Sequence, residues 1–384
     1  MSFITGFLNL DSAPADAQLA ERMLAHARSL GPDGSGLYTQ GPVALGHALV
    51  SITPESRQET SPWRSADGQR VITYDGRLDH REDLCRALGL PASALELPDP
   101  ELILRAHEQW GHDCVTRLEG EFAFALWDNR QQELFCARDP LGACGFHYHL
   151  DGRRFVFASQ IRDVLLGAGL PKRLDELTLG YHLTALVPLA TGTLYAGVMR
   201  LPAGRTLVVR PGGTPAFRTY RQFTMQPEIR LRSPQEYSEA LRGLLDDAVR
   251  SCLRTHHPVA AMLSGGLDST GVACLAARQL AARGQRLVTV SSVVRPGFPD
   301  VDWAREESAF IASATARYPA MDPHFAYGEA FPAVELDDRV YDRRDEPLGD
   351  IKSFRTREMI ELNGLPNTEN PGCFFLPGAA DWAN

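Results

Sequence analysis

The chain has 384 residues, of which 44% are hydrophobic, and a formal net charge of -9 at pH 7. This length favours two domains, and the acidic balance disfavours non-specific nucleic-acid binding, which needs a basic face. The N-terminus lacks a basic segment followed by a long apolar one, and no apolar run is long enough to span a membrane, so secretion and membrane insertion are not expected. Seven scattered cysteines with no metal-ligand spacing indicate reduced thiols and a cytoplasmic protein.

The first part of the chain, residues 1–170, alternates short apolar runs with turn residues. Strands are predicted at 43–52, 71–76, 121–128, 133–138 and 155–159, and helices around 15–29 and 100–110. Many short strands with few helices predict stacked antiparallel sheets with helices outside. Residues 171–232 form a connecting region with further strands that completes this half.

The pattern changes at Ser233, where residues 233–384 begin a second domain. Ser-Pro opens a helix whose apolar residues follow one helical face, predicted to be buried: Leu241, Leu244, Leu245, Ala248, Val249 and Cys252. Strands at 258–263 and 286–294 then alternate with helices at 268–283 and 303–317. This alternation indicates a parallel sheet, which binds ligands beyond the carboxyl ends of its strands.

A glycine-rich turn, Ser-Gly-Gly-Leu-Asp-Ser at 264–269, lies where a predicted strand ends and a helix begins. Glycine lets backbone amides approach a phosphate closely, and the helix N-terminus favours negative charge. The predicted ATP and pyrophosphate site comprises Leu263, Ser264, Gly265, Gly266, Leu267, Asp268 and Ser269. Asp268 needs a cation between it and a phosphate, so it is the predicted Mg²⁺ ligand. The alternative is a structural glycine turn capped by Asp and Ser, without a ligand. The loop is not a Walker-type phosphate loop, because the pattern GxxxxGK(S/T) is absent.

This hexapeptide resembles the pyrophosphate loop of the asparagine synthetase family. Segments of the first half are similar, in the same order, to that family's glutaminase-like domain; they include GHALVSI (46–52), YDGRLDHREDL (74–84), LEGEFAFALWD (118–128) and ARDPLG (137–142). The resemblance implies an N-terminal Ntn-hydrolase-like α-β-β-α sandwich. It also implies a C-terminal parallel-sheet domain of the ATP-pyrophosphatase type, with ATP and Mg²⁺ as cofactors.

The glutaminase positions of the family are altered in this sequence. Ser2 stands in place of the nucleophilic cysteine, Leu49 in place of a glutamine-binding arginine, and Asp75-Gly76-Arg77 in place of Asn-Gly-Glu. A carboxylate at an oxyanion site opposes the developing charge. Asp99 alone keeps a position that resembles a glutamine-binding residue. We therefore expect an inactive glutaminase-like domain.

Loss of the glutaminase with retention of the ATP loop is typical of beta-lactam synthetase and of the lasso-peptide cyclases. Those enzymes adenylate a carboxylate that an amine of the same substrate attacks. The stretch 290–325 looks more like the cyclases than like asparagine synthetases. Asp345, Glu346 and nearby Lys352 match a family segment close to the adenylate and are the predicted catalytic residues.

The resemblance stops near residue 364, where the family continues with a further strand, a second phosphate turn and a helical half-domain. Residues 374–381 are only faintly similar to that strand and turn. We therefore expect a truncated second domain with about three strands, a mobile tail beyond residue 364, and little AMP formation by the chain alone.

The sequence thus predicts an ATP-dependent, amide-forming ligase, foremost a lasso-peptide macrolactam cyclase. The alternatives are a glutamine-hydrolysing or ammonia-dependent asparagine synthase and a non-catalytic nucleotide-binding remnant. The expected partners are a precursor peptide or small amino-acid carboxylate, a second chain that completes the second domain, and a leader-binding or protease partner, with neither nucleic acid nor membrane.

Overall fold

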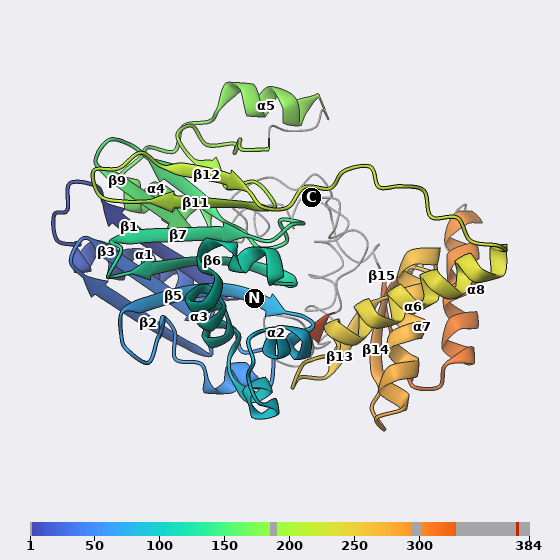
Figure 1. The fold of residues 1–384 in the computed structure, drawn as a ribbon. Coiled ribbons are helices and arrows are strands. Elements are labelled where there is room, and N and C mark those ends of the chain that lie inside the picture. The colour runs from blue at the N-terminus through green and yellow to red at the C-terminus, as the bar shows by residue number, and fades with distance from the viewer. Residues whose placement is uncertain (1, 185–189, 294–301, 328–373, 376–384) are drawn as a thin grey trace. The chain divides into compact units, whose positions relative to one another are not determined.

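The computed structural model describes residues 2–184, 190–293, 302–327 and 374–375 (Figure 1). The chain divides into two compact units, Met1–Thr224 and Met225–Asn384. The predicted catalytic residues Asp345, Glu346 and Lys352 lie outside the described residues. The prediction of a mobile tail also concerns residues outside that part, apart from Phe374 and Phe375.

The first unit contains two six-stranded antiparallel sheets. The first sheet has the order β10 (Met199–Arg200), β8 (His147–Leu150), β9 (Arg154–Ala158), β1 (Phe3–Asn9), β3 (Val43–Leu49) and β2 (Gly34–Gln40). The second has the order β12 (Ala216–Thr219), β11 (Arg205–Val209), β7 (Glu133–Arg138), β6 (Gly120–Asp128), β5 (Arg70–Leu78) and β4 (Trp63–Arg64).

Side-chain burial places these sheets in a four-layer arrangement. Between them lies one apolar cluster to which β1, β3 and β9 contribute from one side and β6, β7 and β11 from the other. Helices α1 (Ala17–Leu30) and α4 (Ile161–Ala168) pack on the outer face of the first sheet. Helices α2 (Arg81–Ala87) and α3 (Asp99–Trp110) cover the second. The predicted α-β-β-α sandwich is confirmed.

Helix α1 shows how the local sequence fixes one of these layers. Asp16 precedes the helix, and its carboxylate accepts hydrogen bonds from the amides of Gln18 and Leu19 at 2.9 and 3.1 Å. This N-cap satisfies donors that a helix start leaves unpaired. The buried residues then recur on one face, namely Leu19, Ala20, Met23, Leu24 and Ala27. Where the structure describes this unit, the remaining helical segments are α5 (Glu176–Leu183) and three short 3₁₀ turns, Glu55–Gln58, Ala92–Glu96 and Gly111–Arg117.

Arg138 and Asp139, at the end of β7, join the segments that pass between the two sheets. The Arg138 guanidinium donates to three backbone carbonyls, those of Gly142, Cys144 and Leu201. The Asp139 carboxylate accepts from three backbone amides, those of Leu141, Ala143 and Cys144, at 2.9–3.2 Å. Asp139 is fully buried, so its hydrogen bonds to amides replace its lost hydration. The loop after β7 and the segment before β11 are thereby held at one point.

The second unit contains a parallel sheet with the order β15 (Met321–Tyr327), β14 (Leu287–Val293), β13 (Val259–Met262) and β16 (Phe374–Phe375). The helices in the described part of this unit are α6 (Pro234–Cys252), α7 (Leu267–Ala281) and α8 (Asp302–Arg317). The predicted parallel sheet is confirmed. The expectation of about three strands is wrong, because Phe374 pairs with Val259 and adds a fourth strand beside β13.

The predicted buried face of α6 is also wrong over most of its length. Leu241 and Leu244 are 58% and 70% exposed, and Leu245 and Ala248 are exposed as well. The cause is that α6 meets the core through its last turns, where Val249 and the following Leu253 join the cluster formed with α7 and β13. A helical period identifies an apolar face without saying how much of it is covered.

Among the described residues, no helix combines the length and the apolar character that crossing a membrane would need.

We predict that Asp139→Ala lowers the free energy of unfolding of the first unit by about 3–5 kcal/mol, because the buried Cys144 amide and two partly buried amides lose their acceptor. The control is Asp151→Ala, which removes a turn carboxylate that accepts the amides of Arg153 and Arg154, both at 2.7 Å, but is half exposed. Its loss is expected to be about 1 kcal/mol, since water replaces the acceptor. Urea unfolding of both variants measures the difference, and equal losses would contradict the prediction.

Candidate functional site

The glycine-rich loop lies at the carboxyl end of β13, between Met262 and the start of α7 at Leu267. The neighbouring strand β14 runs parallel to β13, with Met262 opposite Val290. Leu263 follows in the chain; its side chain is fully buried, and its amide donates to the carbonyl of Val290 at 2.9 Å. The loop is therefore anchored at the edge of the sheet where parallel sheets bind ligands.

Hydrogen bonds between serines at the two ends of the loop fix its shape. The Ser264 amide donates to the Ser269 hydroxyl oxygen at 3.1 Å, and the two hydroxyl oxygens lie 2.9 Å apart. Gly265 has φ +85°, and a Cβ atom there would lie 2.6 Å from the backbone carbonyl oxygen of Glu307 in α8. Only glycine fits this close approach.

The start of α7 leaves its amides available to a ligand. Gly266 is the N-cap residue and supplies no side-chain cap, and Leu267 is 93% exposed. Asp268 is also exposed, in the first turn. The Thr270 hydroxyl is buried without a hydrogen-bond partner among the described residues. A tight glycine turn before an uncapped helix start fits a phosphate group, and an exposed carboxylate beside it fits Mg²⁺.

The altered glutaminase positions gather around the start of β1 and the end of β5. Ser2 is 7% exposed, and its hydroxyl oxygen accepts a hydrogen bond from the Val50 amide at 3.1 Å. Leu49 is also buried, and at the end of β3 its carbonyl accepts from the Asp33 amide. An apolar side chain at this position supplies no charge for a substrate carboxylate.

Asp75 on β5 is the buried carboxylate of this group, 4% exposed, and its Oδ1 has no hydrogen-bond partner in the described part of the chain. Burial raises the pKa of Asp75 to about 7, although the nearby Ser2 amide and Cys144 thiol oppose the rise. The Asp75 carboxyl group is thus partly protonated at neutral pH. Its average negative charge in the fold is therefore smaller than the full charge expected from the sequence.

Gly76 and Arg77 continue β5 with structural contacts. Gly76 has φ +142°, and a Cβ atom there would lie 2.0 Å from the carbonyl oxygen of Glu121 on β6. Arg77 donates to both carboxylate oxygens of Asp79 at 2.8 and 3.2 Å. The glycine is thus required by the close approach of two strands, and the arginine guanidinium is bound by a neighbouring carboxylate.

Asp99 at the start of α3 is engaged by its own chain. Its Oδ2 accepts from the Leu78 amide at 2.9 Å and the Tyr74 hydroxyl at 3.3 Å, and its Oδ1 accepts from Arg81 at 2.9 Å. These contacts give Asp99 a structural role that its resemblance to a glutamine-binding residue did not indicate.

The structure adds one acidic residue that the sequence reasoning missed. Glu59 lies with its Oε1 3.7 Å from Nε2 of His47, and both side chains are almost fully buried. Burial raises the pKa of Glu59 to about 7 and lowers the pKa of His47 to about 3, so at neutral pH His47 is neutral and Glu59 is partly protonated. Glu59 follows the mixed polar segment SITPESRQ (51–58), where no sequence period marks burial.

Comparison with known proteins gives two family matches. The family model described as glutamine amidotransferase domain matches residues 1–221, and that described as asparagine synthase matches residues 240–343. A solved structure titled glutamine phosphoribosylpyrophosphate amidotransferase from B. subtilis, complexed with ADP and GMP, is 14% identical with a TM-score of 0.41; the alignment covers 85% of this chain and 81% of that one.

Three curated relatives are similar over most of this chain. Asparagine synthetase [glutamine-hydrolyzing] 3 of Bacillus subtilis is 29% identical, over 82% of this chain and 50% of its own length. Putative asparagine synthetase [glutamine-hydrolyzing] 2 of Methanocaldococcus jannaschii is 26% identical, over 86% of this chain and 66% of its own length. Amidase chyE of Penicillium rubens is 28% identical, over 86% of this chain and 50% of its own length. The chain thus spans about half to two thirds of the length of these relatives.

We predict that Asp75→Asn stabilises the first unit above neutral pH. The folded-state pKa of Asp75, about 7, exceeds its ordinary value of 3.8, so its contribution to stability is fully present below pH 3.8 and is lost as pH rises through about 7. The amide avoids this loss. The expected gain near pH 8 is on the order of 2–4 kcal/mol, and it vanishes near pH 4.

Denaturant unfolding of both proteins across this pH range measures the gain. The control is Asp67→Asn, because a hydrogen bond from the Ser65 hydroxyl lowers the pKa of Asp67 and its removal gives no gain at high pH. A stability difference between Asp75→Asn and the unaltered protein that does not change with pH would contradict the prediction.

Proposed function

Since the chain belongs to the asparagine synthetase family, we propose that it supplies the nucleotide-binding part of an ATP-dependent ligase that adenylates a carboxylate and forms an amide bond. AMP and pyrophosphate are the products of this chemistry. The observation that carries the proposal is the loop at 264–269, which combines a tight glycine approach with an uncapped helix start at the carboxyl end of β13.

In the proposed complex the pyrophosphate part of ATP lies against the amides from Gly265 to Ser269. Asp268 holds Mg²⁺, which supplies positive charge to the phosphate oxygens. The hydrogen bonds between Ser264 and Ser269 keep the loop in one shape before ATP arrives. Binding then requires little reordering of the chain. Asp345, Glu346 and Lys352 are proposed to act near the adenylated carboxylate.

We further propose that the attacking amine belongs to the substrate itself, as in a lasso-peptide macrolactam cyclase. The support is the state of the glutaminase positions. The hydroxyl oxygen of Ser2 is occupied by the Val50 amide, Leu49 offers no charge, and Asp99 is bound by Arg81. The proposed substrate is a precursor peptide with an Asp or Glu side chain, and the proposed partners are a second chain and a leader-binding or protease protein. The proposed location is the cytoplasm.

An asparagine synthase is the second candidate, favoured by the names of two relatives. Incubation with ATP, Mg²⁺ and L-aspartate distinguishes the candidates. Asparagine and AMP formed with ammonium favour the synthase. AMP formed only with a peptide that carries an acidic side chain favours the cyclase. ATP binding without AMP in either mixture favours the non-catalytic remnant.

We predict that Asp268→Asn weakens Mg-ATP binding at least tenfold, which is about 1.4 kcal/mol, because the cation loses a charged ligand. The fold is expected to persist, since the side chain is exposed. The matched control is Asp247→Asn on α6, which removes the same charge from an exposed pair with Arg250. Calorimetric titration measures both affinities. If folded Asp268→Asn binds Mg-ATP as tightly as the unaltered protein, the loop is a structural turn and not an ATP site.

We predict no glutamine hydrolysis above background and no labelling of residue 2 by a glutamine-mimicking electrophile. Ser2→Cys restores the family's nucleophile but neither the charge missing at Leu49 nor the amide missing at Asp75, so it is expected to stay inactive as well. Glutamate release from labelled glutamine is the measurement. Release by the unaltered protein that disappears in Ser2→Ala would overturn the prediction.

A further inference from the structure

Two histidines and a glutamate meet at one corner of the first unit. His107, His112 and Glu133 each offer one ligand atom, and these atoms all lie within 4.8 Å of one another. None of the three belongs to the loop at 264–269 or to the altered glutaminase positions. Imidazole and carboxylate groups in this number form the usual three-residue ligand set of open zinc sites.

The chain brings these residues together by ending one helix against one strand. His107 is in the last turn of α3, which stops at Gly111, a residue with φ +59°. His112 follows in the next 3₁₀ turn, and Glu133 begins β7. Both imidazole rings pack on the ring of Phe135, with centroid distances of 5.6 Å for His107 and 4.5 Å for His112.

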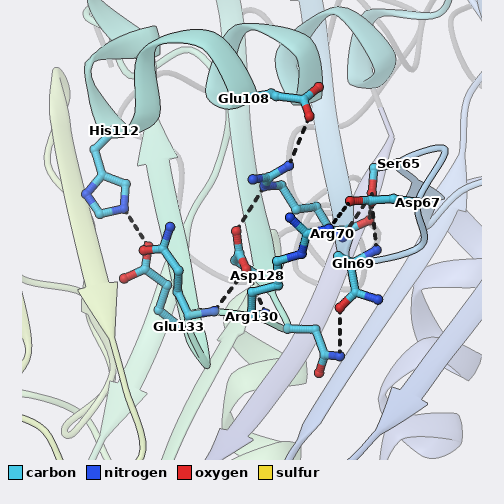
Figure 2. A network of polar contacts seen from close by, with 11 residues as sticks. Ser65, Asp67, Gln69, Arg70, Glu108, His112, Asp128, Arg130 and Glu133 are labelled. Carbon is cyan, nitrogen blue, oxygen red and sulfur yellow. Dashed lines mark hydrogen bonds and ion pairs between the residues drawn. The ribbon is translucent and has the colours of Figure 1, made fainter.

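His112 and Glu133 already point toward each other, as Figure 2 shows. Nε2 of His112 lies 2.7 Å from Oε1 of Glu133. Arg210 donates to the other carboxylate oxygen, Oε2. The carboxylate therefore turns one oxygen toward the histidines while an arginine holds the other, which is how an outer residue orients a metal ligand.

His107 is the member of the group whose burial has no explanation from hydrogen bonding among the described residues. Its side chain is 4% exposed, and neither ring nitrogen has a hydrogen-bond partner among the described residues. The nearby Asp128 side chain, in contrast, has partners: its oxygens accept hydrogen bonds from Arg70 and from the amides of Arg130 and Gln131. A buried imidazole without a partner costs free energy unless a ligand completes it.

We propose that His107, His112 and Glu133 bind one Zn²⁺ ion, with water as the fourth ligand. In a tetrahedral site with bonds of about 2.0–2.1 Å, ligand atoms lie about 3.3 Å apart. Small rotations of the three side chains reach this spacing, and the ion takes the place of the hydrogen bond between His112 and Glu133. The side chain of His112 is 32% exposed, so water reaches the open position.

Titration of the chelator-treated full chain with Zn²⁺ tests the proposal. One ion is expected to bind per chain and to raise the midpoint of thermal unfolding. Co²⁺ serves as a coloured substitute for Zn²⁺ and is expected to give the visible absorption of a tetrahedral site. The near-ultraviolet band of thiolate ligands is expected to be absent, which separates this site from the cysteines.

His107→Phe removes one ligand while keeping an aromatic ring beside Phe135, so the fold is expected to persist with a metal-free midpoint at least as high. Its Zn²⁺ affinity is expected to fall at least tenfold, and Glu133→Gln provides a second ligand variant. The control is His80→Phe, which removes a half-exposed histidine that lies 3.7 Å from Glu119. This control is expected to leave the affinity unchanged.

Three results would each overturn the proposal. The first is that the full chain binds no Zn²⁺. In that case His112, Glu133 and Arg210 form a polar cluster without a metal ion. The second is an affinity that is equal in the unaltered protein and in folded His107→Phe and Glu133→Gln. The third is a thiolate band with Co²⁺, which assigns the ion to cysteine.

Discussion

The first unit depends on a buried pair of opposite charges, Arg138 and Asp139, placed where the chain leaves one sheet for the other. A guanidinium and a carboxylate in a dry interior are stable only when their donors and acceptors are satisfied. Here backbone groups of two separate crossing segments satisfy them. The two segments that cross between the sheets are thereby held together at one point.

The same principle explains the altered glutaminase positions. The charged side chains at these positions are buried, so their polar atoms need partners within the chain. Asp99 and Arg77 find them in Arg81 and Asp79. Asp75 and Glu59 have fewer polar contacts, and burial instead shifts both groups toward their protonated forms. Protonation thus lowers the cost of burying these two carboxyl groups.

The sequence predicted what depends on local pattern. The helix around residues 15–29, the alternating strands and the strand–loop–helix around Ser264 follow from spacing and from turn chemistry. It could not predict what depends on distant partners. Exposure of Leu241 is decided by where α6 meets α7, and the approach of Glu133 to His107 is decided by the packing of α3 against Phe135 on β7. In each case, the deciding neighbour comes from another element.

The fourth strand of the parallel sheet has a consequence for the order of folding. Strand β13 lies between β14, which follows it closely in the chain, and β16, which comes more than a hundred residues later. On the ribosome one edge of β13 therefore stays open until residues 374–375 have been made. Closing so long a loop slows the pairing step, and an open edge invites pairing with other chains. Pairing of β16 with β13 thus competes with pairing of the open β13 edge with other chains.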